Sequence, residues 1–311
     1  MSGSLNKGLF VVRVVLVAFV CGCASEPEAT PRRMGQFPSP MADSVRVHGR
    51  VEKKDVPGVS FALDDVLAKP VDIYFADRTR AADGVDLLVH FHGASYVAKH
   101  AVYGSGRPLV LAVVNLGSGS AVYERAFAEG STFARLVDEV RASVADRTSR
   151  DVRISRVYLS SFSAGYGAVR AILKDHAAMV EGIVLLDGLH TDYVPPRQVL
   201  AEGGRLNGEK LDGFVRYGRL ATAGEKRMLI THSAIFPGTY ASTTECTDYL
   251  IDSLHLKRRP VLKWGPVGMQ MLSETREGGL AILGFAGNSA PDHVDHFHGL
   301  GVFLGMVLDE G

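Results

Sequence analysis

One stretch of the sequence, residues 157 to 173, constrains the possible folds of this chain more than any other. It begins with an apolar run typical of a strand, and its last six residues place apolar side chains on one face at helical spacing. Between these patterns, residues 161 to 165 read Ser-Phe-Ser-Ala-Gly, with small residues around a central serine. A sharp strand-to-helix turn of this kind lifts the serine clear of the sheet and sets helical N–H groups beside it, where they can stabilise an oxyanion. We therefore predict that Ser163 is a nucleophile.

This turn resembles the nucleophile elbow of the α/β-hydrolase fold, usually written Gly-x-Ser-x-Gly, with Ser161 in place of the first glycine. The resemblance covers the chain from about Val71 to its end, through the order of the elements. It implies a serine hydrolase that cleaves an ester or another acyl bond through an acyl-serine intermediate. It does not distinguish an ester from an amide substrate.

Strand patterns recur along the chain and alternate with helical patterns. The chain has 311 residues, of which 46% are hydrophobic, enough for the core of one α/β domain. The alternation predicts an α/β fold with a mostly parallel central sheet and helices on both faces, with its chemistry at the carboxyl ends of the strands. In such a fold the segment 189–225 is a possible small cap over the acyl pocket. The strand patterns cover residues 44–52, 71–76, 85–92, 109–114, 157–161, 182–186, 228–230 and 280–285.

A serine nucleophile needs a base, which the resemblance places late in the chain. After the last strand pattern, Ser289 and Asp292 have the spacing of a capping box, so a helix is expected to begin there. His293 lies in its first turn, and His296 lies about one turn further along. We favour His293 as the general base and keep His296 as the alternative.

The acid that orients this base has several candidates. Asp187 directly follows the strand pattern after the nucleophile strand, and some α/β-hydrolases carry their acid at that place. The commoner place in that fold is after the following strand, where Glu245 and Asp248 stand, but these two also fit a solvated helix face. We favour Asp187 and leave Glu245 open.

The oxyanion hole is expected to combine two backbone N–H groups. One is that of Ala164, directly after the nucleophile. The sequence His92-Gly93-Ala94 resembles the His-Gly loop of esterases and lipases with this fold, which implies the N–H of Ala94 as the second donor. His92 is then a structural brace.

Two rival hypotheses use the same residues differently. His90 and His92 alternate on one strand, so their side chains share a face and could begin a zinc site of a metal-dependent hydrolase. The second rival is a non-catalytic surface protein with a hydrolase-like fold. We favour the serine hydrolase, which needs no cofactor and no metal. The zinc hypothesis would use His90, His92, His232, Asp292, His293 and His296.

The N-terminal segment is expected to be a targeting signal. A short apolar run spans residues 8–20, and Cys23 follows a small residue as in the lipobox of bacterial lipoproteins. We predict a signal peptide over 1–22, a flexible tether lipid-anchored at Cys23 over 23–43, and the domain over 44–311. An ordinary signal peptide cut nearby is the alternative, and both predict export.

Charge and cysteine content limit the partners. Lys+Arg and Asp+Glu are both 34, so nothing in the net charge favours nucleic acid. The expected partners are a small-molecule or lipid-like acyl substrate and, through the anchor, the membrane of the bacterial cell envelope. On the lipoprotein interpretation Cys246 is the only free thiol, and we expect it to be a packed core residue.

Overall fold

The computed structural model of the chain describes residues 48–82 and 84–308. In this part of the chain, ten strands form one sheet in the order β1-β2-β4-β3-β5-β6-β9-β12-β11-β10. Strands β4, β3, β5, β6, β9 and β12 run parallel, and the two strands at each edge are antiparallel to their neighbours. The predicted fold class is confirmed. The strands are β1 (Val59–Leu63), β2 (Val71–Phe75), β3 (Gly84–Phe91), β4 (Leu109–Val114), β5 (Arg153–Phe162), β6 (Val180–Leu186), β9 (Arg227–His232), β10 (Arg259–Trp264), β11 (Gln270–Glu277) and β12 (Leu280–Phe285).

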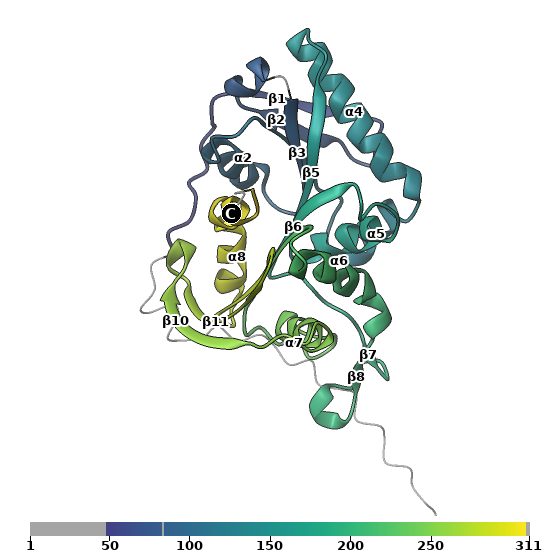
Figure 1. Cartoon of the computed structure of the whole chain (residues 1–311), viewed down its shortest axis with the longest axis vertical. Helices are drawn as coiled ribbons and strands as arrows, with labels where there is room; N and C mark the ends of the chain where they lie inside the picture. The colour runs from purple at the N-terminus through teal and green to yellow at the C-terminus, as the bar shows by residue number, and fades with distance from the viewer. Residues whose placement is uncertain (1–47, 83, 309–311) are drawn as a thin grey trace, which may run out of the picture. The chain divides into compact units, whose positions relative to one another are not determined.

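Helices cover both faces of the sheet and bury one apolar cluster on each. Figure 1 shows α4, α5 and α6 on one side of the sheet and α2 and α8 on the other. The helices are α2 (Ser95–Gly104), α3 (Ser120–Ala126), α4 (Gly130–Thr148), α5 (Tyr166–Asp175), α6 (Asp212–Thr222), α7 (Thr243–Ser253), α8 (Ala290–His298) and α9 (Leu300–Leu308).

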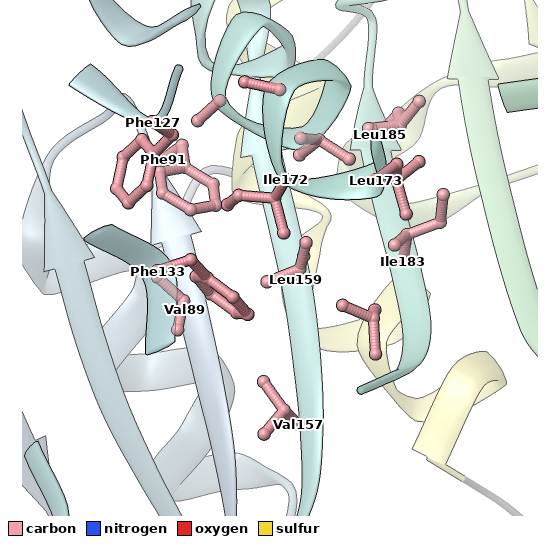
Figure 2. Packing of buried hydrophobic residues seen from close by; sticks show 14 of the residues in the cluster. Val89, Phe91, Phe127, Phe133, Val157, Leu159, Ile172, Leu173, Ile183 and Leu185 are labelled. Atoms are coloured by element: carbon pink, nitrogen blue, oxygen red, sulfur yellow. The ribbon is translucent and has the colours of Figure 1, made fainter. Parts of the chain in front are cut away.

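The central strand β5 is apolar on both faces because both are covered. Val157 and Leu159 point to the first cluster, and Figure 2 shows Leu159 beside Ile172 of α5. Tyr158 and Phe162 point to the second cluster. The end of β5 is therefore held from both sides, which fixes the position of the turn that follows it.

The first strand differs from the prediction. Residues 44–47 lie outside the described residues, and residues 48–52 form no strand. In place of strand pairing, His48 and Arg50 bond to Asp295 of α8, at 2.5 and 2.8 Å. The first strand is β1, which alternates between partly buried and exposed residues and pairs with β2.

The predicted cap segment, 189–225, is only in part a separate structure. Its second half forms α6, which buries Phe214 and Tyr217 in the core cluster of one sheet face. The remainder holds short 3₁₀ turns and a two-stranded hairpin, β7 (Tyr193–Val194) with β8 (Arg205–Leu206). A cap therefore stays a prediction for residues 189–211, of which Leu189, Tyr193 and Leu211 also belong to that core cluster.

The predictions for the N-terminal segment concern residues outside the described part of the chain. The signal peptide, Cys23 and the tether all lie outside the described residues. Within 48–82 and 84–308, no helix combines the length and the apolar character needed to cross a bilayer. Cys246 is fully buried in α7, and burial raises the pKa of its thiol to about 12.

The two buried serines at the end of β5 give a matched pair of stability predictions. Ser160 Oγ bonds to His90 Nδ1 at 2.7 Å, whereas Ser161 Oγ has no partner among the described residues. We expect Ser160→Ala to lower the free energy of unfolding by about 1–3 kcal/mol, since it leaves a buried nitrogen unpaired. Ser161→Ala should be neutral or stabilising by up to about 1 kcal/mol. Urea unfolding of both variants measures this, and equal losses would contradict it.

Candidate active site

Three residues at the carboxyl ends of neighbouring parallel strands have backbone conformations that are rare outside glycine. Ser163, Asp187 and His92 follow β5, β6 and β3, and their φ angles are 47°, 41° and 69°. A positive φ is strained for a residue with a side chain, and such strain persists where the surroundings over-determine it. These three positions therefore share the carboxyl ends of the parallel strands, where parallel α/β folds place their sites, whereas other positive-φ residues such as Asp65 and Arg197 lie elsewhere.

Two glycines make the turn at Ser163 possible. A Cβ on Gly165 would lie 2.2 Å from the carbonyl oxygen of Phe91, so the turn packs directly on the end of β3. A Cβ on Gly188 would lie 2.4 Å from the carbonyl oxygen of Ser163. The elbow and the turn after β6 are thus in backbone contact, which brings Ser163 beside Asp187.

The structure brings Asp187 and His293 together. His293 Nδ1 lies 2.7 Å from Asp187 Oδ2, and the carboxylate is almost fully buried. His293 stands in the first turns of α8, where Ser289 and Asp292 form the predicted capping box. Since a carboxylate accepts hydrogen bonds, Nδ1 donates, and Nε2 of the neutral ring keeps its lone pair and can accept a proton.

Other donors also hold the Asp187 carboxylate. Oδ1 accepts from the Ser233 N–H and the Thr243 hydroxyl, both at 2.9 Å, and Oδ2 accepts from the Ser233 hydroxyl at 2.8 Å. Burial acts to raise the pKa of Asp187, but nearby His296 and the bonds from His293 and Ser233 outweigh it. The pKa therefore lies well below the usual range, and Asp187 is a carboxylate at neutral pH.

Ser163 and His293 line one cavity of about 220 Å³, together with Asp187. Within the described residues no hydrogen bond joins Ser163 to His293, and such bonds are often long in hydrolases without substrate. The Phe162 ring packs against the His293 ring, with centroids 4.5 Å apart. The strand that carries the serine therefore also restrains the imidazole.

The other base and acid candidates have different surroundings. His296 is fully buried, and its Nδ1 bonds to Thr231 Oγ1 at 2.7 Å. Glu245 closes the capping box of α7 and accepts a bond from the Tyr193 hydroxyl. Asp248 pairs with Arg258 and is half-exposed. Neither acidic residue contacts His293 in the described part of the chain.

The histidines of the zinc hypothesis do not converge. His90 bonds to Ser160 and to the His92 carbonyl oxygen, and His92 bonds to the Tyr123 hydroxyl. His232 lies between Thr244 and Arg258. Among the described residues, no group of three or more His, Cys, Asp or Glu side chains has the arrangement to hold a metal ion.

The loop after β3 is held by an amide clamp that the sequence did not reveal. Asn115, just after β4, accepts from the Gly93 N–H and donates to the Gly93 carbonyl, both at 2.9 Å. His92 stacks on Phe162 at 6.1 Å between ring centroids, which agrees with a bracing role. The backbone from His92 to Ala94 is therefore fixed just before α2 begins.

Further site residues escaped sequence reasoning. The sequence did not indicate a site role for Ser233, Thr243 or Asn115. Each lies next to the carboxyl end of a strand or the start of a helix, and only this position could have suggested that it belongs to the site. His190, from the segment after Asp187, lines the 220 Å³ cavity as well. It also lines a larger cavity of about 420 Å³, which Ser163 lines as well.

Comparison with known proteins finds no matching family model and no matching curated protein. Among solved structures, the chain is similar to the feruloyl esterase module from Clostridium thermocellum complexed with sinapinate, with 11% identity and a TM-score of 0.47 over 86% of this chain and 96% of that one. It is also similar to a structure described as FAE, with 12% identity and a TM-score of 0.44 over 90% and 96%. Est1E from Butyrivibrio proteoclasticus matches with 9% identity and a TM-score of 0.38 over 82% and 100%. The fold assignment rests on the strand order.

Two buried histidines predict that stability depends on acid pH. Burial lowers the pKa of His90 to about 3, and burial with nearby Arg258 lowers that of His232 to about 3. Below the unfolded pKa of about 6.5, the unfolded chain binds a proton on each of these rings and the folded protein does not. The free energy of unfolding therefore decreases as the pH is lowered. Each histidine adds about 1.4 kcal/mol per pH unit to this slope.

The slope itself is the quantity to measure. Urea unfolding between pH 6.5 and 5 should show a smaller dependence on pH in His90→Gln and in His232→Gln than in the wild type. The pH range starts at the unfolded pKa of about 6.5. The slope is separate from any overall loss of stability in the variants. Equal slopes in all three proteins would contradict neutral burial of these rings.

Proposed function

We propose that this chain is a serine esterase with Ser163 as nucleophile, His293 as general base and Asp187 as the residue that orients the base. One observation carries the proposal. The buried Asp187 carboxylate holds His293 Nδ1 at 2.7 Å, and Ser163 lines the same cavity on a strained strand-to-helix turn. Nucleophile, acid and base also follow one another in the order Ser, Asp, His, as in α/β-hydrolases.

The chemistry follows from the protonation states. His293 Nε2 takes the proton of the Ser163 hydroxyl as Oγ attacks the acyl carbon, and Asp187 stabilises the imidazolium that forms. Nε2 then gives this proton to the leaving oxygen, the carbon–oxygen bond breaks, and an acyl-serine remains. Water then attacks the acyl carbon as its proton passes to Nε2. Nε2 gives this proton to Ser163 Oγ as the bond between Oγ and the acyl carbon breaks, and the acid and free Ser163 are released.

The oxyanion of each tetrahedral intermediate needs donors that are already in place. We propose that the backbone N–H groups of Ala94 and Ala164 are these donors. Ala164 follows Ser163 in the 3₁₀ turn that leads into α5. Ala94 follows Gly93, whose backbone Asn115 clamps on both sides, so its N–H needs no reorganisation during the reaction.

Ester hydrolysis and labelling by a fluorophosphonate probe test this proposal. In chelator, wild-type protein should hydrolyse p-nitrophenyl esters and be labelled, and Ser163→Ala should lose both, with kcat lower by about 10⁴-fold or more. Ser161→Ala is the matched control, since Ser161 is buried two residues away and should leave labelling intact. Full activity of Ser163→Ala on every ester tested would contradict the proposal.

We further propose that the enzyme is exported and lipid-anchored at Cys23, on the basis of the apolar run and the lipobox-like sequence. Expression in a bacterial host should yield protein that floats with membranes and whose N-terminal peptide carries fatty acyl chains. Cys23→Ser should remove the acyl chains. Acylation that persists in this variant, or wild-type protein without it, would contradict the anchor.

A further inference from the structure

Two cavities meet at Ser163. The smaller one, of about 220 Å³, is lined by His293, Asp187 and the apolar side chains of Ile235, Pro237 and Ala290. The larger one, of about 420 Å³, extends over α3, α5 and the segment after β6. Ser163, His190 and Tyr240 line both. An ester bound at Ser163 would therefore have one part in each cavity.

The proposed mechanism decides which part goes where. His293 must give its proton to the leaving oxygen, so the leaving alcohol occupies the cavity that His293 lines. The acyl group then occupies the larger cavity. This step, and the inference that follows, rests on the proposed function.

The larger cavity is suited to a polar but uncharged acyl group. Its wall carries two ion pairs, Arg170 with Glu124 at 2.6 Å and Lys210 with Asp192. Each cation has its own carboxylate, so neither pair leaves an excess charge for an ionic substrate. The rings of Tyr166 and Tyr240 complete the lining.

His190 presents a hydrogen-bond acceptor at the junction of the two cavities. Its Nδ1 lies 2.8 Å from the Ala241 carbonyl oxygen, and because a carbonyl only accepts, Nδ1 carries the hydrogen. Burial lowers the pKa of His190, so the ring is neutral and Nε2 keeps a lone pair. Tyr166 and Tyr240 pack edge-on against the ring, at 5.4 and 5.0 Å between centroids, and fix its orientation.

The Nε2 lone pair of His190 accepts no hydrogen bond within the described part of the chain. Among the described residues no group donates a hydrogen bond to Nε2. The atom is also not among the unpartnered side-chain atoms that are fully shielded from solvent, so it is accessible. An acceptor held in a fixed direction at the wall of a substrate cavity selects ligands with a matching O–H group. A ligand without that group would cover Nε2 and leave it unpaired.

We propose that the substrate is an ester whose acyl group carries a hydroxyl, and that His190 binds this hydroxyl by accepting its hydrogen at Nε2. The alcohol part is small and apolar, to fit beside Ile235 and Pro237. His190 is thus a specificity residue of the proposed esterase. It takes no part in proton transfer to or from Ser163.

Matched ester pairs test this inference. The substrates are methyl esters of straight-chain acids with a hydroxyl at successive positions, each compared with its methyl ether, which has the same chain but no donor. At the best position, wild-type kcat/KM should be about 10- to 100-fold higher for the hydroxy ester than for the ether.

Two substitutions separate the two ring nitrogens. His190→Asn keeps an amide donor near the position of Nδ1 and removes Nε2, so the preference for the hydroxy ester should fall to about one. His190→Gln places an amide oxygen near the position of Nε2 and should retain part of the preference. The ratio of the two substrates is the readout, because it cancels a general loss of activity.

Three results would overturn the inference. A wild type that hydrolyses both members of every pair equally would overturn it and leave the esterase proposal in place. A His190→Asn variant that folds and keeps the full preference would do the same. Absence of hydrolysis of every ester, with no fluorophosphonate label on Ser163, would overturn the proposed function and this inference with it. The wild-type comparison needs no variant, so a wild type without the preference overturns the inference even if both variants fail to fold.

Discussion

The Asp187 carboxylate is the point on which the rest of the site depends. It is buried at the end of β6 and accepts hydrogen bonds from the end of β9, the start of α7 and α8. Because the carboxylate is buried, each hydrogen bond to it contributes more to stability than a bond at the surface. Loss of one donor would leave part of the desolvation penalty uncompensated. This one group therefore fixes both the tautomer of His293 and the relative placement of three elements around Ser163.

Direct backbone contact between neighbouring turns also positions the site. Gly165 packs on the end of β3 and Gly188 packs on Ser163, so the turns after neighbouring strands touch without intervening side chains. Strain at Ser163, Asp187 and His92 is held by the surrounding sheet, whose central strands are apolar on both faces. Ser163 and Asp187 thus stand on turns that pack directly against the backbone of neighbouring segments. The loops that follow them, with His190 and Tyr240, form part of the cavity walls.

The sequence predicted the sheet because buried parallel strands leave long apolar runs, as in 85–92 and 109–114. It predicted the start of α8 because a capping box is a local signal. It missed β1, whose residues are only partly buried or exposed, and β10, which is largely exposed. It also missed β11, where polar residues such as Glu274 and Thr275 occupy buried positions and weaken the apolar pattern. It favoured Asp187 but left Glu245 open, because the choice depends on contacts between distant segments, His293 with Asp187 and Tyr193 with Glu245. For the same reason it gave no sign of the Asn115 clamp or of His190.

The most direct test of the whole account is a crystal structure of the protein after reaction with a fluorophosphonate. The account predicts phosphorus bonded to Ser163 Oγ, the phosphoryl oxygen within hydrogen-bond distance of the Ala94 and Ala164 N–H groups, and His293 still bonded to Asp187. An adduct on a different residue would contradict the assignment of the nucleophile. An adduct on Ser163 whose phosphoryl oxygen points away from both N–H groups would contradict the oxyanion hole.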